Sequence, residues 1–150
     1  MRHYILLLLM AFCMPFALSG QKLHVDKVLD GRYCKHPQTT DVVYSGIHLF
    51  DLPIAYYHSL TVFDDAQMMD AVVDAVASDE PQAAEKEVTR VGKHIFFCFL
   101  RMKPVDGESR FIIFKDMRYA PAGKKRQVTL IYMEGECSSA QIRKMFRTSK

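Results

Sequence analysis

The feature that most constrains the fold is a pair of segments, 95–100 and 111–114, that are apolar at every position. Successive side chains of a β-strand point to opposite faces of the sheet, so a strand of this kind needs cover on both faces. Helices can cover one face. We expect loops, a partner subunit or a ligand to cover the other, because a bare apolar face of this size is unusual on a monomer.

The β segments are joined by turn signals rather than by helical stretches. Gly92-Lys93 fits a tight hairpin turn, and Pro104-Val105-Asp106-Gly107 is a second turn signal. Alternating or β-branched and aromatic runs predict the remaining strands. The predicted strands cover residues 41–45, 56–63, 87–91, 94–102, 110–114 and 127–133.

Helices are predicted before, within and after the strands. Apolar spacing of three and four residues favours a first helix over 24–34. Asp64 with Gln67 reads as a capping box for a long helix over 64–77, which is expected to resume from 81 to 86. Ser138 with Gln141 is a second capping box, for the final helix. This order predicts a two-layer α+β fold, with a mostly antiparallel sheet of about five to six strands packed by two or three helices.

The first twenty residues have the pattern of a secretory signal peptide. A positive start at Arg2 precedes the apolar run 4–18, and small residues follow it. A membrane-spanning helix needs about 20 apolar residues, whereas this run is shorter and contains Pro15. We expect cleavage after Ser19 or Gly20, a single α+β domain over 21–150 without a transmembrane segment, and a periplasmic or secreted location.

Three cysteines remain after the predicted cleavage. Cys98 lies inside an apolar run and is expected to be a buried small side chain. Because exported proteins form disulfides, Cys34 and Cys137 are the pair to test for a bridge. The spacings of these cysteines match neither a zinc site nor a thioredoxin-type motif.

Signals for catalysis are weak. The sequence has no G-x-S-x-G elbow, and no cofactor is expected. The segment from His48 to Asp65 gathers imidazoles and carboxylates that could serve a metal-dependent or other hydrolase. Its spacing matches no established metal motif, so solvated side chains are the preferred interpretation. The residues concerned are His48, Asp51, His58, Asp64 and Asp65.

Charge divides the chain into two unequal halves. Residues 21–87 hold 12 acidic and 5 basic residues, a net −7, and residues 88–150 hold 5 acidic and 14 basic residues, a net +9. Basic surfaces attract polyanions, and an exported protein is not expected to meet nucleic acid. The alternative is that the two halves neutralise each other in the fold. The candidate anion or partner patch comprises Lys115, Arg118, Lys124, Lys125 and Arg126.

The order of elements resembles a group of small exported proteins of Gram-negative gut bacteria whose domains have no known function. The matching segments are Val25–Leu29, Ser59–Val62 and Val128–Gly135, together with the signal peptide. The resemblance implies an envelope location and a compact α+β fold. It implies no activity and no catalytic residues.

These observations together predict a non-enzymatic interaction module of the cell envelope. Its partner would be an envelope protein or an anionic surface, bound through the second sheet face or the basic patch. The hydrolase at 48–65 is the first alternative. A homodimer that associates through the sheet face is the second.

Overall fold

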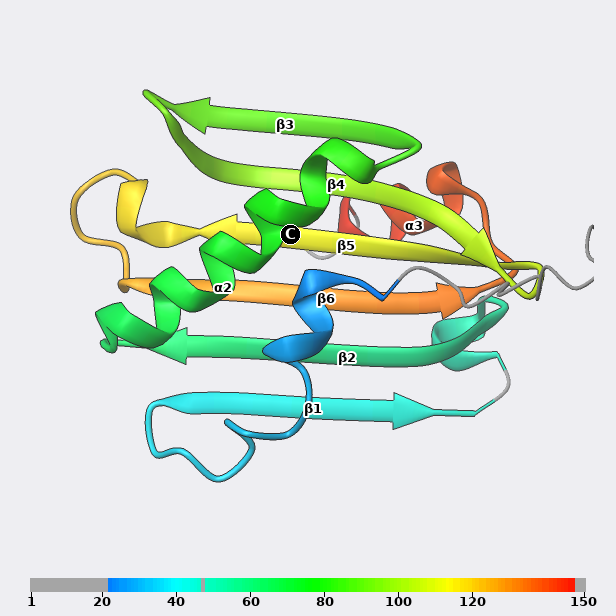
Figure 1. The fold of residues 1–150 in the computed structure, drawn as a ribbon, viewed down its shortest axis with the longest axis horizontal. Helices are drawn as coiled ribbons and strands as arrows, with labels where there is room; N and C mark the ends of the chain where they lie inside the picture. Colours follow the sequence, from blue (N-terminus) through cyan, green and yellow to red (C-terminus); the bar gives the residue numbers. More distant parts are fainter. Residues whose placement is uncertain (1–21, 47, 148–150) are drawn as a thin grey trace, which may run out of the picture.

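The computed structural model describes residues 22–46 and 48–147, and it confirms the α+β fold. Six antiparallel strands form one sheet, with helices on both of its faces (Figure 1). The predicted signal peptide, 1–20, lies outside the described residues. Short 3₁₀ helices are labelled η. In chain order the elements are η1 His24–Lys27, β1 Thr39–Ser45, η2 Leu49–Asp51, β2 Ile54–Phe63, α2 Ala66–Asp79, η3 Glu80–Gln82, β3 Glu85–Val91, β4 His94–Val105, β5 Glu108–Asp116, η4 Met117–Tyr119, β6 Gln127–Gly135 and α3 Ser139–Arg147.

The last strand in the chain lies in the middle of the sheet. The strand order is β1-β2-β6-β5-β4-β3, and every neighbouring pair is antiparallel. Consecutive hairpins account for β1-β2 and β3-β4-β5, and β6 then joins the two groups. The β1-β2 group and the β3-β4-β5 group therefore form one sheet only when β6 pairs with both β2 and β5.

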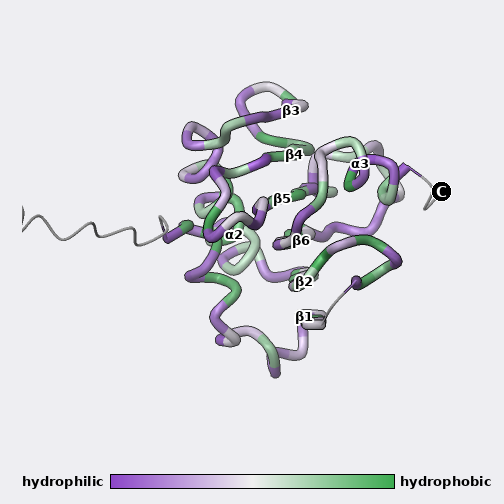
Figure 2. The backbone as a smooth tube through the Cα atoms, turned by 90° about the vertical axis from the view of Figure 1, so that its right-hand side faces the viewer, coloured by the Kyte–Doolittle hydropathy of each residue, from purple (hydrophilic) through white to green (hydrophobic). Residues whose placement is uncertain are grey.

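The first face of the sheet packs against α2 and η1. The apolar face of α2 presents Met69, Val72 and Val76 to buried strand residues such as Leu100 and Leu130. In Figure 2, α2 lies on one side of the strands and α3 on the other. Helix α2 crosses the sheet diagonally, and η1 packs beside it on the same face (Figure 1).

The second apolar face is covered by the chain itself. A second buried cluster joins Phe99, Phe111 and Met133 of the sheet to Ile142 of α3. Leu49 and Leu52, in and after η2, pack against the same cluster. The sequence predicts helices on one face and loops, a partner or a ligand on the other. The structure confirms the loop cover, through Leu49 and Leu52, and adds α3, which the sequence did not place on this face.

The beginning of the chain is less helical than predicted. The expected helix over 24–34 is the single 3₁₀ turn η1, and residues after it form turns in which Gly31 adopts φ 88. Only glycine adopts this conformation without strain, so the helix cannot continue through it.

The caps of the two main helices were predicted with different success. Asp64 adopts φ 51, and it is Asp65 whose carboxylate accepts the Met68 N–H at 2.9 Å, so the cap of α2 lies one residue later than predicted. The expected helical resumption at 81–86 is also wrong, because η3 ends at Gln82 and β3 begins at Glu85. The capping box of α3 is confirmed, since Ser138 and Gln141 exchange hydrogen bonds of 2.8 and 3.2 Å.

Candidate functional site

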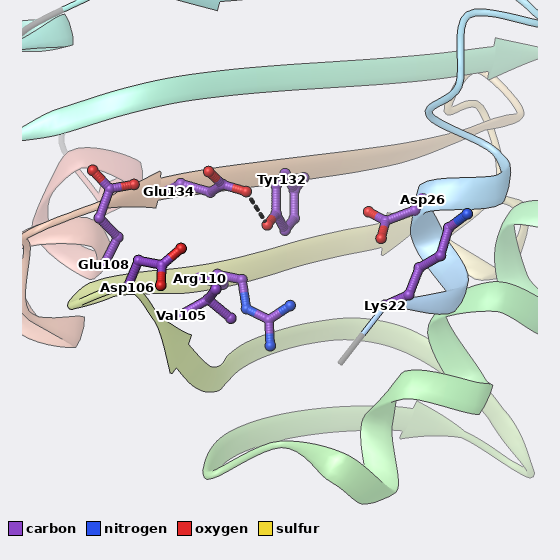
Figure 3. Close-up of a pocket in the computed structure, with 8 residues that line it drawn as sticks. All are labelled: Lys22, Asp26, Val105, Asp106, Glu108, Arg110, Tyr132 and Glu134. Atoms are coloured by element: carbon purple, nitrogen blue, oxygen red, sulfur yellow. Dashed lines mark hydrogen bonds between the residues drawn. The ribbon is translucent and has the colours of Figure 1, made fainter. Parts of the chain in front are cut away.

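A polar pocket of about 440 Å³ opens on the α2 face of the sheet, beside η1. We call it the η1 pocket, because η1 forms one of its walls (Figure 3). Strands β5 and β6 and the β4–β5 turn form the others. Its lining comprises Lys22, Asp26, Val105, Asp106, Glu108, Arg110, Tyr132 and Glu134.

The alternation of side chains along β5 and β6 determines which residues form the floor of the η1 pocket. Tyr132 and Glu134 are two residues apart on β6, so both point to the α2 face. Arg110 of β5 lies directly opposite Glu134 in the register. Asp106 of the β4–β5 turn and Glu108, the first residue of β5, add two more carboxylates to the lining.

Carboxylates outnumber cations in this pocket. Asp26, Asp106, Glu108 and Glu134 face two basic side chains, Lys22 and Arg110. Arg110 is buried, and its Nε donates to the backbone carbonyl of Lys103 at 3.0 Å, so its guanidinium belongs to the wall. The lining therefore carries an excess of two negative charges when every group is ionised.

Asp26 is the carboxylate that η1 contributes. It accepts the backbone N–H of Leu23 at 3.0 Å and is turned toward Tyr132 (Figure 3). Burial raises the pKa of Asp26 above its ordinary value, against the lowering effect of that hydrogen bond. A cation placed beside this carboxylate would favour its ionised form.

Tyr132 and Glu134 form a pre-set hydrogen-bonding pair. The Tyr132 hydroxyl donates to Glu134 Oε1 at 2.5 Å. Burial and the Glu134 carboxylate raise the pKa of Tyr132, so its hydroxyl stays protonated and fixes one carboxylate oxygen in place. The second oxygen of Glu134 accepts no hydrogen bond from residues 22–46 and 48–147.

A second polar row continues from the pocket toward the β1 edge. His58 Nε2 lies 2.5 Å from Asp41 Oδ1, and His58 Nδ1 lies 3.2 Å from the Tyr56 hydroxyl. The ring of Tyr56 then packs edge-on against Tyr132, with centroids 6.1 Å apart. Burial raises the pKa of Tyr56, with further contributions from surrounding carboxylates. Since His58 is buried and held from both sides, it acts as a support for this wall.

The residues of the predicted hydrolase segment are spread over the molecule. His48 lies in the β1–β2 connection, Asp65 caps α2 beyond the opposite end of β2, and His58 lies on the α2 face between them. In residues 22–46 and 48–147, no group of three His, Cys, Asp or Glu side chains is placed to hold a metal ion. The structure does not gather Asp51 or Asp64 with them either.

The predicted basic patch is partly used inside the fold. Arg118 forms ion pairs of 2.8 Å with both Asp116 and Asp70, so this cation is neutralised by the chain itself. Lys125 Nζ lies 4.2 Å from the centroid of the Phe63 ring, and Lys115 Nζ lies 6.0 Å from that of Phe96. Lys124 and Arg126 are exposed in the loop before β6.

The three described cysteines are all free thiols. Cys98 is buried, as predicted. Cys34 is exposed and Cys137 is buried in the cluster beneath α3, and the structure contains no disulfide between them.

Sequence reasoning missed the η1 pocket. Its members are mostly ordinary charged residues on three separate stretches of chain, and only the β5–β6 register brings Arg110 and Glu134 together. The available signal was the change from apolar Val128 and Leu130 to polar Tyr132 and Glu134 at alternate positions of the strand.

Comparison with known proteins gives one match. The model of a family of unknown function (DUF6108) matches residues 12–146. No curated protein and no solved structure matches the chain. Over the described part of the chain, none of the helices has the length and apolar character needed to cross a membrane.

Proposed function

Because the chain belongs to this family of unknown function, we propose its role from its own geometry. We infer an exported, non-enzymatic binding module of the cell envelope that holds a small organic amine in the η1 pocket. The observation that carries the proposal is a cavity of about 440 Å³ whose lining has four carboxylates against two cations. A cation bound in this cavity would offset the negative excess of the lining.

The arrangement of the pocket favours an ammonium group over a bare metal ion. Its acids come from separate elements, and across the described residues they do not form a three-ligand group. An ammonium instead needs hydrogen-bond acceptors placed around three donors. Glu134, oriented by Tyr132, and Asp26, anchored by Leu23, are two such acceptors on opposite walls.

The state of the lining groups supports binding rather than chemistry. Tyr132 already donates a hydrogen bond to Glu134, and a phenol with a raised pKa is a poor proton donor in catalysis. Arg110 is tied to the Lys103 carbonyl. These groups can orient a ligand without transferring a proton or forming a covalent bond.

The location is supported by the pattern of residues 1–20. The full chain, produced in a Gram-negative host and fractionated, is expected in the periplasm or medium. Intact-mass measurement should give a mature chain that begins at Gly20 or Gln21. A chain that keeps Met1 and stays in the cytosol contradicts export and leaves the binding proposal untouched.

The ligand class is tested with a matched pair of probes, 1,4-diaminobutane and 1,4-butanediol. The two differ in their ammonium groups and share the same four-carbon chain. Isothermal titration should detect the diamine and not the diol. Equal responses to both compounds would show that the pocket does not select positive charge.

Matched variants locate the binding site. Glu134→Gln keeps an acceptor for Tyr132 but removes the charge, and the loss of one charged hydrogen bond should weaken diamine binding by about tenfold or more. Asp74→Asn removes a carboxylate from the exposed face of α2 and should leave binding unchanged. Equal losses in the two variants would mean that only the net charge of the protein matters.

A further inference from the structure

The two edges of the sheet are built differently. The β3 edge carries Glu85, Lys86, Glu87 and Arg90 among its seven residues, and a register irregularity lies between Thr89 and Arg90. Charges and bulges of this kind prevent an edge strand from pairing with another chain. Arg143 of α3 adds ion pairs to two of these acids, at 2.9 and 3.6 Å.

The β1 edge lacks these protections. Its sequence, Thr39–Ser45, has no lysine, arginine or proline, and its register with β2 is continuous. Its one charged residue, Asp41, turns its carboxylate to the α2 face against His58, and that side chain is 6% exposed. In contrast, Val43 and Tyr44 are 52% and 51% exposed.

The direction of the free backbone groups of β1 follows from its pairing with β2. Phe63 donates to the Gln38 carbonyl at one end of the ladder, and Gly46 donates to Ala55 at the other. Because hydrogen-bonded pairs alternate in an antiparallel ladder, the even-numbered residues of β1 face β2 and the odd-numbered residues face outward. The Thr39 N–H is already bonded to the His36 carbonyl at 3.1 Å. The outward-facing residues that remain are Asp41, Val43 and Ser45.

We propose that β1 pairs antiparallel with β1 of a second copy of this chain, about a two-fold axis at Val43. In this register Val43 faces its own counterpart and Asp41 faces Ser45, so all three outward residues gain partners. An axis at Val42 would require the Thr39 N–H that His36 already occupies. An axis at Asp41 would set two aspartates opposite each other, which is unfavourable.

A second copy fits this edge because the assembly closes. Each chain has one unprotected edge, and the protected β3 edges would end the joined sheet on both sides. The same register places Val42 opposite Tyr44 on the α3 face. Tyr44 packs there against Tyr57 and Phe50, with centroids 5.9 and 6.1 Å apart. Pairing would therefore bury these aromatic side chains at the two-fold axis.

Two valines at opposite edges provide the first test. Light scattering after size exclusion is expected to show a wild-type dimer. Val43→Lys places two ammonium groups opposite each other and should give a folded monomer. Val91→Lys, at a β3 residue that is 45% exposed, should remain a dimer. A wild-type chain that is monomeric at high micromolar concentration overturns the proposal, even if β1 binds another protein. A Val43→Lys variant that remains a dimer also overturns it.

Cysteine crosslinking tests the register in a Cys34→Ser background. Facing residues of a hydrogen-bonded antiparallel pair have Cα atoms about 5.5 Å apart, a separation that a disulfide spans. Val43→Cys should crosslink with itself. Val42→Cys and Tyr44→Cys should crosslink when mixed and not when alone. Self-crosslinking of Val42→Cys in place of Val43→Cys overturns the two-fold axis proposed here.

Discussion

The carboxylate of Asp79, the last residue of α2, accepts the backbone N–H of Val25 at 2.9 Å. Its other oxygen accepts the His24 N–H at 2.8 Å and lies 2.8 Å from the His24 ring nitrogen. Asp79 is fully buried. This one side chain thus fastens η1 to the end of the long helix, and η1 in turn brings Asp26 to the pocket.

Replacement of Asp79 should be costly. In Asp79→Ala, two backbone donors lose a charged acceptor, and we expect the free energy of unfolding to fall by about 2–3 kcal/mol. Urea denaturation followed by circular dichroism measures the change. The control Asp74→Ala, on the exposed side of the same helix, should stay within about 0.5 kcal/mol of wild type. Similar losses in both variants would contradict the anchoring role.

Gly135 should tolerate no side chain. A Cβ there would collide with the Pro53 carbonyl oxygen and lie 2.8 Å from the Ile54 Cα, both of them backbone atoms. Gly135→Ala is therefore expected to destabilise the fold by several kcal/mol or to prevent folding. At Gly46 the nearest atom to a Cβ is 3.5 Å away, on the Leu49 side chain. We expect the melting temperature of Gly46→Ala to be close to that of the wild type. The melting temperature of Gly135→Ala should be strongly lowered.

Two adjacent aspartates should respond in different ways. Asp65→Ala removes the cap of α2 and should lower stability by about 1 kcal/mol. Asp64→Gly places glycine at φ 51, a conformation that glycine adopts readily, so stability should be unchanged or slightly raised. Chemical denaturation of the two variants decides which residue caps the helix. A larger loss at position 64 would restore the cap predicted from the sequence.

The thiols should differ in reactivity. Burial raises the pKa of Cys98 to about 12, and burial also raises the pKa of Cys137. Cys34 is exposed. Because the thiolate is the reactive form, iodoacetamide near pH 8 should modify Cys34 in the native protein and reach the other two only after unfolding. Peptide mass mapping gives the site-specific rates, and rapid native labelling of Cys98 would contradict its burial.

The sequence predicted the elements better than their arrangement. Turn signals at Gly92-Lys93 and strong strand residues located β3 to β6 within a few positions, because these are local properties. The position of β6 between β2 and β5 depends on pairing between residues far apart in sequence, such as Leu60 with Leu130. No local pattern specifies that choice.

The same limit explains the candidate site. The apolar segments at 95–100 and 111–114 correctly predicted that both faces of the sheet are covered. They could not show that α3 covers the face opposite α2. Arg118 was predicted as part of a basic patch because its ion pairs, with Asp116 and with Asp70 48 residues away, form only in the folded chain. The η1 pocket could not be predicted for the same reason, since Asp26 and Glu134 come to line one pocket only when β6 is inserted between β2 and β5.

The dependence of amine binding on pH tests the central proposal most directly. 1,4-Diaminobutane stays cationic from about pH 4 to 8, as aliphatic amines do, so any change in affinity comes from the protein. Because the pKa of Asp26 is raised, its carboxylate is lost as pH falls through that raised value, above the ordinary 3.8. Titration calorimetry should show that the wild type binds more tightly than Asp26→Asn at pH 7. As the pH falls, the wild-type affinity should decrease first and approach that of the variant. No measurable diamine binding at pH 7, or binding that strengthens on acidification, would contradict the account.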